Sequence, residues 1–174
     1  MNEELRAKLA AALSGAGMAG FKDTTTSIRP KWRASFSFRG EIDGETSYVH
    51  VYVPDHADEL QVNCSAPAPA LNPVSPHQLH DELAQFNAAH APGSAGWDRV
   101  LGELGAGPGS AAGWQAATKP YVGMQHRMVL ARVTLPLDSL APASVGLAIR
   151  LGVRLATTAR ELVTGSLAPS PDDE

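Results

Sequence analysis

Alternating apolar and polar positions predict a three-stranded meander in the first half of the chain. After Pro30 the alternation is strict, and the apolar side chains that share one face are Trp32, Ala34, Phe36 and Phe38. The Asp43-Gly44 pair is typical of a tight hairpin turn, and the β-branched and aromatic run of residues 48–53 follows it. A third alternation places Leu60, Val62 and Cys64 on one face, so three antiparallel strands are expected.

Helical spacing appears in three other segments. Residues 3–18 carry leucines at helical spacing, Ser75 and Pro76 are typical of a helix start, and a long apolar stripe runs through residues 145–163. Residues 113–118 and 127–135 indicate a second hairpin. The glycine-rich residues 91–113 indicate an irregular crossover with about one helical turn in the short amphipathic piece 97–104. The order α-β-β-β-α-β-β-α predicts an α+β fold with an antiparallel sheet of about five strands and three helices.

The length of 174 residues favours one domain. We expect that domain to cover residues 1–167 and to be followed by a disordered tail, residues 168–174. The single Cys64 excludes an internal disulfide, and the start Met-Asn-Glu-Glu-Leu lacks the basic and apolar regions of a secretion signal. No window approaches 18 uninterrupted apolar residues. A cytoplasmic protein with no membrane partner is therefore expected.

Charge is segregated along the chain although the net charge is only −4. Between Arg39 and Arg99 there are nine Asp or Glu and no Lys or Arg, whereas residues 99–160 hold seven basic residues against Glu103 and Asp138. Separate solvated faces explain such runs most simply, and attraction to a second copy is the alternative.

Candidate catalytic and metal-binding residues are few. His77 and His80 lie three apart at the start of a helix, a spacing that suits one metal ion, but a metal site needs three or four ligands. Cys64 has the inward parity of its strand, which predicts an inert thiol, and Ser110 lacks the strand that precedes a serine nucleophile. We therefore expect no catalytic residue, no metal and no cofactor; a small metal-dependent enzyme that uses His77 and His80 is an alternative.

A basic stripe on the first strand is the best sequence argument for nucleic-acid binding. It consists of Arg29, Lys31, Arg33 and Arg39. Aromatic side chains, which stack on bases, are not interleaved with it along that strand, and the sequence pI is about 5.8. Direct nucleic-acid binding is thus not expected, and a nucleic-acid-associated regulatory factor is kept as an alternative.

The element order resembles that of the YbjN family and of the type III secretion chaperone-like fold. Three features carry the resemblance: Gln85-Phe86-Asn87 near the end of a helix, the closing strand 129–138, and the long helix that follows it. The crossover 91–113 is longer than the family leads one to expect. The resemblance implies a non-enzymatic homodimer that binds a partner protein, in a family associated with stress responses.

The leading hypothesis is a chaperone-like or adaptor protein that dimerises and binds another protein, of a stress response or of DNA metabolism. Exposed strand edges and apolar helix surface would supply the contacts. The expected dimer interface consists of Val145, Ile149, Leu155 and Leu162. The expected partner-binding residues are Arg33, Arg39, Trp97 and Trp114.

Overall fold

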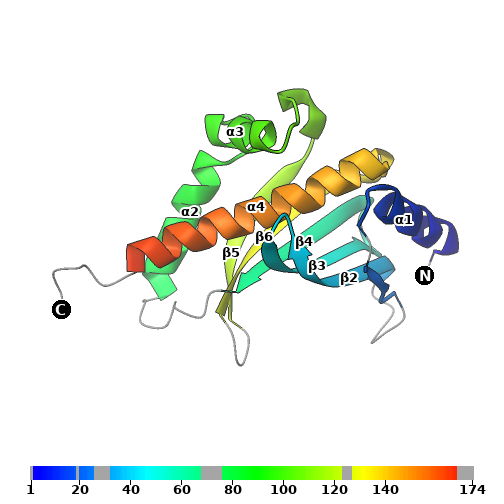
Figure 1. Cartoon of the computed structure of the whole chain (residues 1–174), viewed down its shortest axis with the longest axis horizontal. Coiled ribbons are helices and arrows are strands. Elements are labelled where there is room, and N and C mark those ends of the chain that lie inside the picture. Colours follow the sequence, from blue (N-terminus) through cyan, green and yellow to red (C-terminus); the bar gives the residue numbers. More distant parts are fainter. Residues whose placement is uncertain (1, 19, 26–31, 68–75, 123–126, 168–174) are drawn as a thin grey trace.

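The computed structural model of the chain describes residues 2–18, 20–25, 32–67, 76–122 and 127–167. Within these residues it has a mixed α+β fold, and one antiparallel sheet has the strand order β1-β2-β3-β4-β6-β5 (Figure 1). The strands are β1 (Lys22–Asp23), β2 (Trp32–Ile42), β3 (Glu45–Pro54), β4 (Glu59–Pro67), β5 (Gln115–Val122) and β6 (Arg127–Pro136). The helices are α1 (Glu3–Gly15), α2 (Pro76–Ala89), α3 (Ala95–Glu103) and α4 (Pro142–Leu167), with short 3-10 turns η1 (Pro108–Ala111) and η2 (Leu137–Ser139).

The meander and the second hairpin are confirmed. β2 and β3 meet at Asp43 and Gly44, whose φ angles of 51° and 82° are the pair of positive values that a tight hairpin turn requires. β4 continues the meander, and β6 pairs with both β4 and β5. The expected helix start at Ser75 and the expected tail lie outside the described residues.

Two elements differ from the prediction of five strands and three helices. The sixth strand, β1, pairs only two residues with β2 and lies in a polar segment that carries no alternation. The fourth helix, α3, lies inside the crossover that the sequence marks as irregular. Ser94 caps it by accepting a hydrogen bond from the Trp97 backbone N–H (3.2 Å), and burial of Trp97, Val100 and Leu101 outweighs the low helix propensity of its two glycines.

The core lies between one face of the sheet and α4, which crosses that face diagonally and packs mainly on β6 and β4 (Figure 1). Val145, Ile149 and Leu155 are fully or almost fully buried there. They hold the helix on its own sheet and are not on the surface, so their assignment to a dimer interface is wrong. Leu162, which is 45% exposed, is the one residue of that set that a second copy can reach.

The two tryptophans that were expected to contact a partner are also core residues. Trp97 of α3 is 2% exposed and Trp114, just before β5, is 3% exposed. Because α3 is a helix and not an open loop, it has an apolar face that turns Trp97 inward. Neither indole is available to another protein.

A β-bulge changes the face on which Trp32 lies. The register between β2 and β3 shifts between Trp32 and Ala34, so the strict alternation read from the sequence breaks at this point. Ala34 faces the core, whereas the Trp32 ring contacts His50 and Tyr52 on the opposite face, with centroid distances of 5.0 and 5.9 Å.

The segregated charges pair with one another inside the molecule. Three arginines of α4 contact acidic residues of the β2–β3 hairpin and of α3. The pairs are Arg150–Asp43 at 2.9 Å, Arg154–Glu103 at 2.7 Å and Arg160–Glu45 at 3.3 Å. Through Asp43 and Glu45 the acidic middle of the chain meets the basic last third across the fold, whereas Glu103 lies within the basic third itself.

Side chains cap one backbone position near each side of the sheet, on β5 and on β2. At the β5 edge, the Asn87 side chain of α2 accepts a hydrogen bond from the Thr118 backbone N–H (2.7 Å) and donates one to the Thr118 carbonyl (2.9 Å). Pro120 of the same edge has no N–H to offer. On the other side, just after the end of β1, Thr25 bonds to the backbone N–H and carbonyl of Ser35 of β2. A partner strand would first have to displace these caps.

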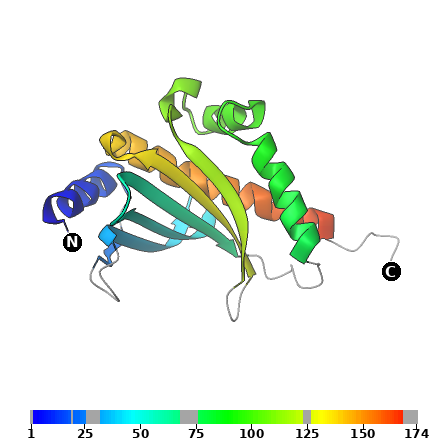
Figure 2. The same cartoon turned by 180° about the vertical axis from the view of Figure 1, so that it is seen from behind.

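The sheet face opposite α4 is open. In Figure 2, which shows the molecule from behind, α1 and α2 lie at its two sides and no helix of the described chain crosses it. None of the described helices is both long enough and apolar enough to span a bilayer.

Candidate binding site

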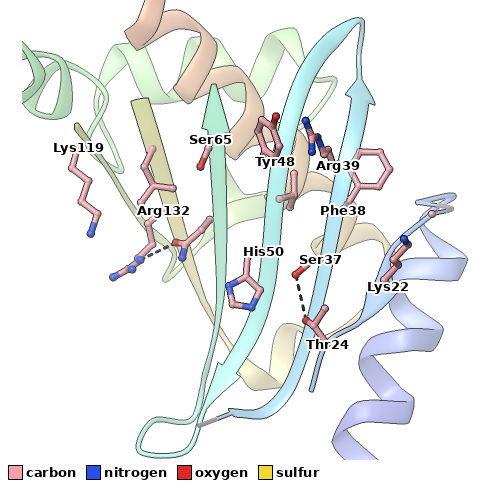
Figure 3. A pocket seen from close by; sticks show the side chains of 14 residues that line it. Lys22, Thr24, Ser37, Phe38, Arg39, Tyr48, His50, Ser65, Lys119 and Arg132 are labelled. Carbon is pink, nitrogen blue, oxygen red and sulfur yellow. Dashed lines mark hydrogen bonds between the residues drawn. The ribbon is translucent and has the colours of Figure 1, made fainter. Parts of the chain in front are cut away.

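The open sheet face contains a hollow of about 780 Å³. We call it the basic hollow, because the cationic side chains of Lys22, Arg39, Lys119 and Arg132 lie around polar and apolar side chains of the strands between them (Figure 3). Its volume is within the usual range of ligand sites, about 300–1,000 Å³.

Strand register builds the hollow from two rows of directly opposed residues. The first row is Lys22, Ser37, His50, Asn63 and Arg132. The second row is Arg39, Tyr48, Ser65, Leu130 and Lys119. Opposed residues of a sheet point to the same face, and strands lie about 4.8 Å apart, so each row extends over about 19 Å. Each row begins and ends with a cation.

No described residue of the lining compensates the positive charge of the hollow. The four cations come from β1, β2, β5 and β6, and none of the described residues that line the hollow is an Asp or a Glu. Among the described residues, Lys22, Arg39 and Lys119 form no ion pair. Glu41 lies two residues beyond Arg39 on the strand, outside the lining. A ligand in the hollow therefore meets positive potential from several sides.

Hydrogen bonds fix the polar side chains at one end of the hollow. The Thr24 and Ser35 hydroxyls are 2.8 Å apart, and the Ser35 Oγ is 2.7 Å from Nε2 of His50. Partial burial lowers the pKa of His50 below its ordinary value, so the imidazole is held in its neutral form near pH 7. His50 thus serves as a polar, uncharged part of the floor.

Two of the cations are oriented by their neighbours. Nε of Arg132 donates to Oδ1 of Asn63 (2.9 Å), and Asn63 in turn donates to the Tyr52 hydroxyl (3.3 Å). The Arg39 guanidinium lies over the Tyr48 ring, 4.9 Å from its centroid. These contacts leave the terminal nitrogens of both guanidinium groups to bind an anion.

The arrangement suits binding better than nucleophilic chemistry. Ser35 and His50 form the kind of contact that activates a serine, but Ser35 is fully buried, so its hydroxyl orients the imidazole and is out of reach of a substrate. Cys64 is buried on the core side of β4, as predicted, and burial raises the pKa of its thiol. Anion recognition by fixed N–H and O–H donors is the chemistry that the lining offers.

Only one of the predicted partner-binding residues lies in the hollow. Arg39 lines it, whereas Nη2 of Arg33 donates to the Ala57 carbonyl (2.8 Å) and to Oδ1 of Asp58 (2.7 Å) in the β3–β4 turn. Arg29 and Lys31 of the predicted stripe lie outside the described residues.

The histidine pair of α2 is not assembled into a larger cluster within the part of the chain that the structure describes. His80 is exposed, and the side chain of His77 lies outside the described residues. No group of three or more His, Cys, Asp or Glu suited to a metal ion occurs among the described side chains.

Most of the lining was not predicted from the sequence. The basic stripe has no aromatic residue interleaved along its own strand, but β3 brings Tyr48 and His50 directly opposite Arg39 and Ser37. One feature of the sequence could have located them: Tyr48, His50 and Tyr52 alternate with apolar residues on their strand and therefore share its outward face. Which residues of the other strands lie beside them depends on register, and β6 joins β4 from far along the chain.

Comparisons with known proteins show the fold alone. None of the models of protein families matches the sequence, and none of the curated proteins matches it. Among solved structures, the chain is similar to an uncharacterized protein from Methanothermobacter thermautotrophicus, with a TM-score of 0.55 and 8% sequence identity. The similarity covers 94% of this chain and 99% of that one.

Proposed function

We propose that the protein works by binding and not by catalysis, and that the basic hollow holds an acidic segment of a partner protein. One observation carries the proposal: four cations from four strands converge on a hollow whose described lining contains no carboxylate. An acidic segment supplies the missing counter-charges and accepts hydrogen bonds from the lining.

The shape of the site also favours a polypeptide segment. The hollow follows the rows across the strands for about 19 Å, a length that about six extended residues span. It is an open surface and not an enclosed cavity, so a segment of a larger protein can enter sideways. Strand addition at the sheet edges is a poorer route, because Asn87 and Thr25 already bond backbone groups of β5 and β2 there.

The predicted resemblance to the YbjN family points to the same class of function, a non-enzymatic protein that binds a partner. The proposal depends on the open sheet face and not on family membership.

A second candidate is single-stranded nucleic acid. It is favoured by one specific observation, the presence of Tyr48 and His50 between the cations of the hollow. In other proteins, sheet faces that combine aromatic rings with basic side chains bind nucleic acid strands. The Tyr48 ring is already contacted by Arg39 on one side, which leaves less of it for a base.

Fluorescence anisotropy with a fluorescein-labelled peptide of six glutamates tests the proposal. We expect the wild-type protein to bind it and each of Arg39→Ala and Lys119→Ala to weaken binding by about tenfold, the effect of losing one charge-assisted hydrogen bond. Arg99→Ala and Lys8→Ala are matched controls, because both cations are exposed and lie outside the hollow. Equal losses in the controls would show a nonspecific charge effect and exclude the basic hollow as the site.

A further inference from the structure

A second hollow, of about 560 Å³, lies beside the basic hollow on the open face. We call it the aromatic hollow, because Trp32, Tyr52 and Pro54 line it together with the exposed Asp55 and His56 of the following turn. Arg132 lines both hollows. The two are therefore adjoining parts of one surface, with a guanidinium between them.

The β-bulge creates the aromatic hollow. By shifting the register at the start of β2, it places Trp32 on the open face, where its ring makes a T-shaped contact with the His50 ring at an interplanar angle of 77°. His50 in turn stacks on Tyr52, with ring centroids 4.4 Å apart. Tyr52 is buried and its hydroxyl bonds to Gln61, which holds its ring in place, and Trp32 is the partly exposed outer member of the cluster.

The two hollows differ in charge. The basic hollow has four cations and no described carboxylate in its lining, whereas the lining of the aromatic hollow includes the carboxylate of Asp55 and only the shared Arg132 as a permanent cation. A second anionic group placed beside Asp55 would be repelled. An uncharged, flat or bulky apolar group fits the rings of Trp32 and Tyr52 without that cost.

From this difference in charge we propose that the partner's acidic segment carries an aromatic or large apolar side chain at one end. That side chain binds in the aromatic hollow, while the acidic residues of the segment bind in the basic hollow. This inference rests on the proposed function and adds the feature that makes one acidic segment bind better than another. Trp32 is the residue that determines this specificity.

The same difference in charge between the hollows favours a polypeptide over a nucleic acid strand. A nucleic acid carries a phosphate at every nucleotide, so a base seated on Trp32 would bring its own phosphate close to Asp55. A polypeptide can place its carboxylates on one side of the aromatic residue and uncharged residues on the other. The segment therefore has a preferred direction on the sheet.

Three fluorescein-labelled probes test the inference by anisotropy: a peptide of five glutamates followed by glycine and phenylalanine, the same peptide with alanine in place of phenylalanine, and a decamer of deoxythymidine. We expect the wild-type protein to bind the phenylalanine peptide about tenfold more tightly than the alanine peptide, since burial of one aromatic ring supplies at least this much. Trp32→Ala should remove the difference and leave the alanine peptide unaffected. Trp32→Phe should keep part of it, and Arg39→Ala should weaken both peptides equally.

Tryptophan fluorescence gives a readout that does not depend on a variant's folding. Of the three tryptophans of the chain, Trp97 and Trp114 are buried and Trp32 is partly exposed. Acrylamide should therefore quench mainly Trp32, and the phenylalanine peptide, but not the alanine peptide, should protect it.

The outcomes separate the two proposals. If both peptides bind equally well, lose affinity together in Arg39→Ala and give Trp32 no protection, the aromatic hollow is overturned as a subsite while the proposed function stands. If neither peptide binds, both proposals fail. Tighter binding of the deoxythymidine decamer than of either peptide, with loss in Trp32→Ala, would replace the polypeptide with single-stranded nucleic acid.

Discussion

Gly152 of α4 faces Cys64 of β4 so closely that a Cβ atom at Gly152 would lie 2.6 Å from the Cys64 Sγ. The Cys64 thiol also lies 3.7 Å from the Ile149 carbonyl of the same helix. The absence of a side chain at one position of the helix is thus what allows α4 to reach the sheet at its centre.

Gly152→Ala should lower the free energy of unfolding by about 1–3 kcal/mol, the usual cost of overpacking a tight core. Cys64→Ala should restore part of that loss in the double variant, because it removes the atom with which the new methyl group collides. Urea denaturation of the four proteins of this cycle measures the coupling. Gly102→Ala is the matched control: a Cβ there meets nothing within 4 Å, so the change should be neutral or stabilising by up to about 1 kcal/mol.

Asn87→Ala should destabilise the protein by about 1–3 kcal/mol, because it leaves the backbone N–H and carbonyl of Thr118 without the partner that now caps them. It should also promote aggregation through the uncovered β5 edge, measurable by light scattering during heating. Gln85→Ala, an exposed change on the same helix, should stay within about 0.5 kcal/mol of the wild type. Equal stability of the two variants would contradict the capping role.

The stability of the protein should fall as the pH drops below about 6.5, the ordinary pKa of histidine in an unfolded chain. Burial lowers the pKa of His50 in the folded protein, so in this range the unfolded chain binds a proton that the folded protein does not. The loss should level off below the folded pKa. Urea denaturation between pH 7.5 and pH 5 should show a shallower dependence for His50→Gln than for the wild type; identical slopes would exclude His50 as a source.

Substitution should lower the free energy of unfolding much more at Ile149 than at Leu162, although both belong to the stripe that the sequence assigns to a dimer interface. Ile149→Ala should cost about 2–5 kcal/mol, because the residue is fully buried against the sheet, whereas Leu162→Asp should cost about 0.5 kcal/mol or less. On the homodimer hypothesis, static light scattering should give a dimer for the wild type and a monomer for Leu162→Asp. A monomeric wild type contradicts that hypothesis.

The fold was largely predictable where local pattern determines it. Strict alternation located β2, the Asp43-Gly44 pair located the hairpin, and the long apolar stripe located α4. The same stripe misled the functional assignment of Val145 and Ile149, because helical periodicity shows that a face is apolar but not whether it packs on its own sheet or on another molecule.

The candidate site was much less predictable, because its residues come together through long-range register. Arg132 and Asn63 are opposed only once β6 has paired with β4, and Lys119 joins them through β5. The face on which Trp32 lies could not be predicted from the sequence either, although it depends on local structure. A bulge of one residue reverses the face of a side chain, and nothing in the alternation of β2 marks where it occurs.

The position of α4 has a consequence for how the protein is made. This helix is the last described element, and it covers the centre of the apolar sheet face. During synthesis all six strands leave the ribosome before it does, so for that interval the buried valines and leucines of β3, β4 and β6 are exposed to water. A chain released before α4 is complete should be insoluble, and folding of the nascent protein should depend on a chaperone until this helix is available.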